Sequence, residues 1–222
     1  MNDVTKSHEI YTLGIVLLGD FNPVIITPYW LSSKSIIRET EADTAKVEII
    51  HSDITRFETD WLIVEASKNR IDFTTKRESH FSALKDLVVS VFTLLKETPI
   101  KAIGINHLCH YSFRDIIEYE NFGYWLSPAK ELAEILNKPK LNLIQFIETT
   151  GEKKEDGRIQ LAIAPSDLVL DSKSVVFNAN HHFNNLKGTS AKSILELLNS
   201  KWDFSFKKVN ELNQLIWKIA KY

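Results

Sequence analysis

Metal-binding residue types cluster near the middle of the chain, at His107, Cys109 and His110. Two further histidines, His181 and His182, lie in a later segment whose apolar pattern predicts a strand. Successive side chains on a strand point to opposite faces, so His107 and Cys109 share a face and His110 points the other way. At most two of these three side chains can therefore bind one ion. The pattern favours a core histidine beside a buried free cysteine over a metal centre.

Other signatures of catalysis are missing from the sequence. No Gly-x-Ser-x-Gly turn presents a serine nucleophile, and no comparable frame surrounds Cys109. No glycine-rich loop ends in Gly-Lys-Ser or Gly-Lys-Thr, the pattern that holds nucleotide phosphates. Carboxylate pairs such as Asp53 with Glu58 lie in polar loops or at strand ends, where they act as solvating charges. We therefore expect no enzyme activity, no cofactor and no bound metal, with metal-dependent catalysis around His107 and Cys109 as one alternative.

Composition narrows the class of protein further. The chain of 222 residues is 44% hydrophobic, which is enough for a full core, and its formal net charge of -2 gives no global field that attracts nucleic acid. Residues 1–8 lack the basic start and apolar stretch of a secretory signal, and the longest apolar run is too short to span a bilayer. Cys109 is the only cysteine, so no intrachain disulfide can form. We expect a cytoplasmic protein without membrane contact, and residues 1–8 as a disordered or loose tail.

The elements that must position these residues are repeated along the chain. Leu13-Gly14-Ile15 followed by Tyr29-Trp30-Leu31-Ser32 is matched later by Ile103-Gly104-Ile105 followed by Tyr124-Trp125-Leu126-Ser127. In the same order, Phe73 is matched by Phe177, and Phe81-Ser82 by Phe204-Ser205. We interpret these matches as an internal duplication. The first repeat unit covers 9–98, and the second, with a longer C-terminal helical arm, covers 99–222, the two forming one fused domain.

Hydrophobic periodicity predicts the same element order in both units. The first unit has predicted strands at 10–18, 47–50, 54–58, 61–66 and 70–75, and helices at 28–37 and 81–95. The second has predicted strands at 100–111, 141–149, 158–164 and 174–183, and helices at 128–136, 190–198 and 204–220. Each unit therefore reads as β-α-β(3-4)-α. The fold class is α+β, a curved antiparallel sheet with helices packed on one face.

Three segments carry a likeness to a known family. They are Arg70-Ile71-Asp72-Phe73 running into 81–95, the strand Ile103-Gly104-Ile105-Asn106, and Val176-Phe177-Asn178-Ala179-Asn180 leading to the last helical arm. In this arrangement the chain resembles a sporadically distributed family of uncharacterised prokaryotic proteins, whose doubled strand-helix-meander-helix unit is like the two halves of TATA-box-binding protein. The resemblance implies this fold and a prokaryotic cytoplasmic setting, and it supplies no enzyme activity. It does not imply DNA binding, because the sequence has no counterpart to a basic rim with intercalating aromatic residues.

Strand alternation places a candidate binding site on the solvent face of the sheet. A row of amides, hydroxyls and guanidinium groups binds a peptide or an oligonucleotide without performing chemistry. We therefore expect a non-catalytic interaction module, an accessory subunit of a prokaryotic multiprotein system of defence type, with a protein partner. Nucleic-acid binding on the concave sheet face is the alternative, and it predicts a contiguous basic stripe with Arg70 and Arg158. The candidate binding residues are Arg70, Asp72, Thr74, Arg158, Gln160, Asn178, Asn180 and His182.

The sequence also bears on oligomeric state. A sheet edge such as Val47–Ile50 offers a surface on which a second copy can pair. An internal duplication, however, already supplies the twofold that a homodimer otherwise provides. A monomer is therefore favoured over a homodimer.

Overall fold

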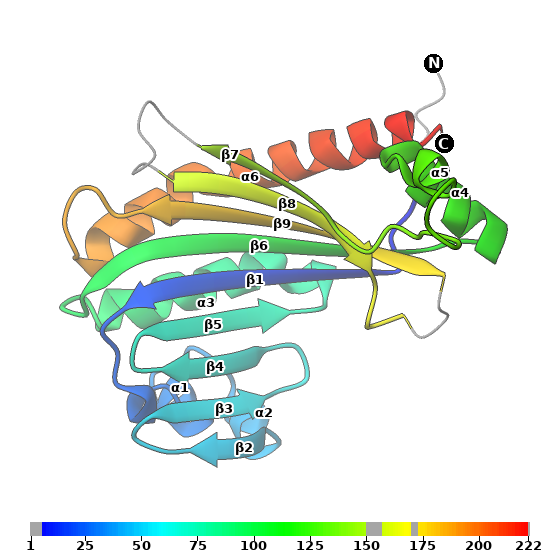
Figure 1. Ribbon diagram of the computed structural model, residues 1–222. Helices are drawn as coiled ribbons and strands as arrows, with labels where there is room; N and C mark the ends of the chain where they lie inside the picture. The colour runs from blue at the N-terminus through cyan, green and yellow to red at the C-terminus, as the bar shows by residue number, and fades with distance from the viewer. Residues whose placement is uncertain (1–5, 150–156, 170–172, 222) are drawn as a thin grey trace.

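The structure, a computed structural model, describes residues 6–149, 157–169 and 173–221. Within these residues, nine strands form one antiparallel sheet in the order β2-β3-β4-β5-β1-β6-β9-β8-β7, and the sheet is curved and unclosed (Figure 1). The strands are β1 (Ile10–Gly19), β2 (Lys46–Ile50), β3 (Ile54–Glu58), β4 (Ile63–Ser67), β5 (Arg70–Thr75), β6 (Ile100–Ser112), β7 (Ile144–Thr149), β8 (Gly157–Pro165) and β9 (Ser174–Asn184).

Two long helices cover one face of this sheet (Figure 1). Helix α3 (Phe81–Leu94) packs on β1 and β5, and α6 (Ala191–Ile219) packs on β6 and β9. The predicted α+β class, with a large curved antiparallel sheet and helices, is confirmed. The remaining helices are short: η1 (Pro23–Ile25), α1 (Pro28–Ser33), α2 (Glu39–Asp43), η2 (Glu78–His80), α4 (Ile116–Leu126) and α5 (Ala129–Leu132).

The core lies between the sheet and the helices because strand alternation sends one side of each strand towards them. On β1, Leu13, Ile15 and Leu17 are fully buried on the helix side. Two apolar clusters fill this layer, one under α3 and the start of α6, the other under α4 and the end of α6. Helix α3 contributes the buried stripe that its period predicts: Leu84, Leu87, Val88, Val91 and Phe92.

A local twofold relates the two central strands. β1 and β6 are antiparallel neighbours, with Ile15 opposite Ile105, Gly14 opposite Asn106 and Val16 opposite Gly104. The matched Leu-Gly-Ile and Ile-Gly-Ile segments are thus equivalent about the Ile15–Ile105 pair. Strand pairing is also similar in the two halves. The last strand of each half pairs with the first strand of the same half, β5 with β1 and β9 with β6.

Other sequence matches do not correspond in the structure. Phe73 lies opposite Ile15, whereas the residue opposite Ile105 is His181. The counterpart of Phe73 is therefore His181, and the match to Phe177 is wrong by four positions along the strand. Phe81 begins α3, whereas its sequence match Phe204 lies inside α6. These short matches therefore do not mark equivalent positions.

Two predicted helices differ in their bounds from the observed ones, and two more are joined into one. The helix predicted at 28–37 begins as expected, with Thr27 Oγ1 accepting a hydrogen bond from Trp30 N at 3.2 Å, but it ends at Ser33. The helix predicted at 128–136 is observed only in part, as α5, and a longer helix, α4, begins earlier at Ile116 and ends before Pro128. Ile116 and Ile117 are exposed, so no clear apolar stripe marked α4.

The two helices predicted at the C-terminus form one continuous helix, α6. No proline or glycine interrupts residues 199–203, and Trp202 and Ser205 are buried, so the packed stripe continues through the predicted break. A helix of 29 residues is about 43 Å long, enough to run beside both apolar clusters. In the described part of the chain, no helix is both long and apolar enough to cross a bilayer.

Part of the predicted tail contacts the folded chain. His8 Nε2 lies 2.8 Å from Glu78 Oε1, and Lys6 Nζ lies 4.3 Å from the centre of the Phe113 ring. Residues 6–8 are therefore held against the end of the sheet, while the first five residues of the predicted tail lie outside the described residues.

Candidate binding site on the open sheet face

The predicted binding residues lie on the sheet face turned away from α3 and α6, which we call the open face. Their strand neighbours Phe73, Leu161 and Ala179 are buried on the helix side, so alternation places the polar residues opposite. The arginines are exposed and the others half-buried. β5 contributes Arg70, Asp72 and Thr74, β8 contributes Arg158 and Gln160, and β9 contributes Asn178, Asn180 and His182.

A row of polar residues crosses the centre of the open face, which we call the amide row. The register sets Gln160 opposite Asn180, Asn180 opposite Asn106, Asn106 opposite Gly14, and Gly14 opposite Thr74. Neighbouring strands lie about 4.8 Å apart, so the row spans about 19 Å. The structure thus brings Gln160, Asn180 and Thr74 into one line and adds Asn106 and Gly14, which the sequence did not single out.

Two glycines form the middle of this surface, and packing does not require either of them. A Cβ on Gly14 would lie 3.4 Å from Thr74 Oγ1, and one on Gly104 would lie 3.4 Å from Asn106 Oδ1 and 3.6 Å from Val16 Cβ. Neither glycine has a positive φ. Glycine weakens a strand interior, and it often marks a place where a ligand or another backbone approaches closely. Gly14 and Gly104 are themselves buried, and they leave room for a side chain on β1 and β6 at the centre of the open face.

Polar atoms beside these glycines lack partners. Among the described residues, Asn106 Oδ1 and Thr12 Oγ1 are out of contact with solvent and make no hydrogen bond. A buried polar group without a partner costs about 1–3 kcal/mol. The Asn106 oxygen lies beside Gly104, 3.4 Å from the place that a Cβ of this residue would take. This oxygen is therefore an unpaired, buried acceptor at the centre of the open face.

The charged residues of the open face are largely paired with one another. Both Arg70 Nε and Nη2 donate to Asp72 at 2.6 Å, and the hydrogen bond to Asp72 raises the pKa of Arg70. Arg56 Nε lies 3.2 Å from Glu48 Oε2 and Arg56 Nη1 lies 3.8 Å from Glu65 Oε2. Along this half of the face, carboxylates and guanidinium groups therefore balance each other.

Arg70 and Arg158 do not adjoin. They lie on β5 and β8, and β1, β6 and β9 separate these strands. The cross-strand row of Arg158 continues through His182, Gly104 and Val16 and ends on the β5 side at Asp72. The two arginines therefore do not meet in one row.

His110 and His182 lie on the open face, as alternation predicts, but they differ in exposure. His182 is half-buried, and its Nε2 lies 3.0 Å from Asn184 Oδ1. His110 is only 3% exposed, because the segment after β8 brings Ser166 Oγ within 2.8 Å of its Nδ1. His110 is therefore buried although it lies on the face away from the helices, and burial lowers the pKa of its imidazole.

On the helix side, a buried hydrogen-bonded chain joins β1, β6, β9 and α6, which we call the histidine chain. Tyr11 Oη lies 2.7 Å from His107 Nδ1, His107 Nε2 lies 2.6 Å from Ser205 Oγ, and Ser205 Oγ lies 2.8 Å from His181 Nδ1. One set of neutral tautomers makes all three bonds, with the tyrosine, His107 Nε2–H and serine each donating onward, and the chain ends at His181, whose buried Nε2 has no partner among the described residues. Burial lowers the pKa of His107 to about 3 and that of His181 to about 4.

The histidine chain bears on the predicted metal ligands. His107 is a core histidine and Cys109 a buried free cysteine, as the favoured interpretation predicts. Hydrogen bonds engage both ring nitrogens of His107, and burial raises the pKa of Cys109 to about 11, which keeps the thiol protonated. In the part of the chain that the structure describes, no three His, Cys, Asp or Glu residues are grouped to hold a metal ion.

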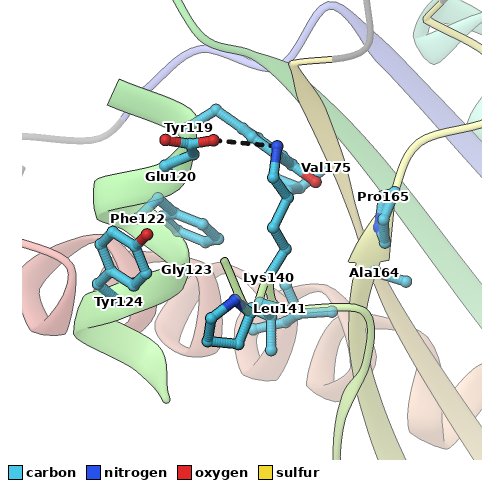
Figure 2. A pocket seen from close by; sticks show the side chains of 12 residues that line it. Tyr119, Glu120, Phe122, Gly123, Tyr124, Lys140, Leu141, Ala164, Pro165 and Val175 are labelled. Atoms are coloured by element: carbon cyan, nitrogen blue, oxygen red, sulfur yellow. Dashed lines mark ion pairs between the residues drawn. The ribbon is translucent and has the colours of Figure 1, made fainter. Parts of the chain in front are cut away.

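A narrow apolar crevice lies between α4 and the β8–β9 pair (Figure 2). Phe122, Leu141 and Val175 contribute to its walls, and Lys140 reaches across to Glu120 with an ion pair of 3.0 Å. The space inside is ≈ 20 Å³, which is about the room that one water needs. The crevice is therefore too small for an organic cofactor.

No protein-family model matches the chain. No curated protein sequence matches it either. The function proposed below therefore follows from the arrangement of residues on the open face.

Proposed function

We propose that the chain is a non-catalytic interaction module that binds an extended segment of a partner protein across the amide row of its open face. In this proposal it is an accessory subunit of a prokaryotic multiprotein system of defence type, and it works in the cytoplasm. The observation that carries the proposal is the pair of glycines, Gly14 and Gly104. They sit where packing leaves room for a side chain, beside the unpartnered oxygen of Asn106.

The chemistry of the amide row suits a peptide backbone. Each side-chain amide offers both donors and an acceptor, as each peptide unit of an extended segment does. Gln160, Asn180 and Asn106 stand on neighbouring strands, so they present these groups at about the spacing of strands in a sheet. Gly14 and Gly104, which we call the glycine floor, lack the side chains that would hold a second backbone away from these strands.

The charge pattern supports a protein partner over nucleic acid. A protein that binds a phosphate backbone needs unpaired Lys and Arg along the path of the strand. Here Arg70 is bound to Asp72, and Arg56 lies between Glu48 and Glu65. The nucleic-acid alternative requires strong dependence of binding on salt, which the experiment below measures.

We also propose that the chain arose by internal duplication. The in-register equivalence of Gly14 with Gly104 about the Ile15–Ile105 pair supports it. The similar pairing of β5 with β1 and of β9 with β6 supports it further. On this account, the duplication placed two glycines side by side at the centre of one continuous sheet.

Co-purification from the native cytoplasm tests the proposed function. Tagged wild type is compared with the double variant Gly14→Ala/Gly104→Ala, with and without nuclease and at two salt concentrations. The added methyl groups meet only ordinary contacts, so the fold survives while the floor is covered. Loss of two backbone hydrogen bonds worth about 0.5–1.5 kcal/mol each weakens partner binding by roughly 5- to 150-fold.

A control variant and nuclease treatment distinguish a protein partner from nucleic acid. Ser200→Ala, on the exposed side of α6, retains the partner at the wild-type level. A nuclease-resistant protein retained by wild type and by Ser200→Ala, but reduced in the double variant, supports the proposal. Material that is lost on nuclease treatment identifies nucleic acid as the partner and overturns it.

A further inference from the structure

The outermost strand β7 has an unprotected edge. Among the described residues it pairs with β8 alone, so the backbone groups on its outer side have no strand partner. Phe146 is 62% exposed on the helix side of the strand, and Ile147 is 60% exposed on the open face. Leu143, directly before the strand, is 54% exposed. Backbone hydrogen-bonding groups and apolar side chains are thus presented together, which favours strand pairing.

The opposite edge of the same sheet is guarded. β2 begins with Lys46, its register with β3 shifts between Val47 and Ile49, and Glu48 is paired with Arg56 at 3.2 Å. Charged side chains and bulges are the usual means by which proteins prevent edge pairing. The register of β7 with β8 is unbroken. Both edges expose apolar side chains, Val47, Ile49 and Ile50 on β2 being 41–43% exposed, and they differ in that only β2 has a shifted register and begins with a lysine.

The sequence of β7 is self-complementary. In an antiparallel pair, directly opposed side chains lie on the same face. If two copies meet about a twofold at Gln145, Ile144 faces Phe146 of the second copy on the helix side. In the same register Leu143 faces Ile147 on the open face. Every exposed apolar residue of the edge then meets another apolar residue.

The charged residue of β7 is compatible with this register. Glu148 is the only charged residue of β7, and Lys208 of α6 holds it at 2.9 Å. With the twofold at Gln145, the two Glu148 residues are six positions apart along the paired strands, about 20 Å. No like charges face each other, so a second copy of this chain meets no repulsion from the strand itself.

We propose that β7 pairs antiparallel with β7 of a second copy, joining two sheets into one across a twofold at Gln145. This differs from the monomer that the sequence favours, because the duplication leaves the sheet unclosed with one edge unguarded. The dimer is independent of the proposed function. The double variant Gly14→Ala/Gly104→Ala leaves it intact, so the two proposals fail separately.

Sedimentation velocity on the full chain tests the pairing. Wild type is expected at twice the chain mass of 25.5 kDa. Phe146→Lys and Ile147→Lys replace exposed side chains, so they fold normally and shift the protein to the monomer. Ile49→Lys, on the guarded edge at 42% exposure, is the matched control and stays dimeric. A monomeric wild type, or a dimer that both β7 lysines leave intact, overturns the proposal.

Cysteine cross-linking tests the register. The only native cysteine, Cys109, is buried and does not interfere. Gln145→Cys is expected to form an intermolecular disulfide on oxidation, because directly opposed Cβ atoms lie about 4.5–5.5 Å apart, close to the reach of a disulfide. Glu148→Cys, whose copies stand about 20 Å apart, does not cross-link. Linkage through Glu148→Cys but not Gln145→Cys contradicts the proposed twofold.

Discussion

The histidine chain makes the fold sensitive to acid. In the unfolded chain an imidazole has a pKa of about 6.5. In the folded chain burial lowers the pKa of His107 to about 3 and that of His181 to about 4. Between these values the unfolded state binds more protons than the folded state. Stability is therefore complete above about pH 6.5 and falls as the pH drops towards the folded-state values.

The magnitude follows from the difference in pKa. At pH 5, about 1.5 pH units below the unfolded-state pKa, protonation of each imidazole stabilises the unfolded state by about 2 kcal/mol, at 1.36 kcal/mol per pH unit. Both side chains are fully buried, so solvent screening does not reduce this figure. Together, His107 and His181 lower the free energy of unfolding by about 4 kcal/mol between pH 7 and pH 5.

Urea denaturation at pH 7 and pH 5 measures this loss. His107→Gln and His181→Gln each remove a titrating group, so each variant should lose about 2 kcal/mol less than wild type between the two pH values. Ser200→Ala, which changes no titrating group at an exposed site, should keep the full wild-type loss. A double variant His107→Gln/His181→Gln with the same pH dependence as wild type would refute the reasoning.

The remaining predictions concern stability and are checked by urea or thermal denaturation at neutral pH. Ser205→Ala leaves two buried imidazoles without their shared partner and should cost about 2–4 kcal/mol; a cost no larger than that of Ser200→Ala would contradict the hydrogen-bonded chain. Gly14→Ala and Gly104→Ala, made singly, should raise stability by up to about 1 kcal/mol, since alanine suits a strand interior better than glycine. Gly19→Ala should lower it, because the added carbon would collide with the carbonyl oxygen of Pro99, and an unchanged melting temperature would contradict this. Thr27→Ala removes the cap of α1 and should cost about 1 kcal/mol.

Local pattern was enough to predict most of the sheet. β3 and β5 have the predicted bounds, and α3 differs by one residue at its end, because period-two alternation and an apolar stripe each report a buried face directly. α4 escaped prediction because its first residues are exposed. One signal was present, since Asp115 Oδ1 accepts from Glu118 N at 2.9 Å, the Asp-x-x-Glu pattern of a helix start.

The candidate site depended on information that no local pattern holds. Alternation placed Gln160 and Asn180 on the correct face, but the amide row exists only through the registers of β8, β9, β6, β1 and β5. In the sequence Gly14 is only part of a repeat, and the room for a side chain at this position is visible only in the structure. The partner of His107 on α6 is 98 residues away in the sequence, so the histidine chain had no sequence signature.

The most direct test of the central claim is the amount of protein partner that co-purifies with wild type and with Gly14→Ala/Gly104→Ala after nuclease treatment. The account predicts a nuclease-resistant protein that wild type and Ser200→Ala retain and that the double variant largely loses while remaining folded. Equal retention by all three would show that the glycine floor of the open face is not the binding site.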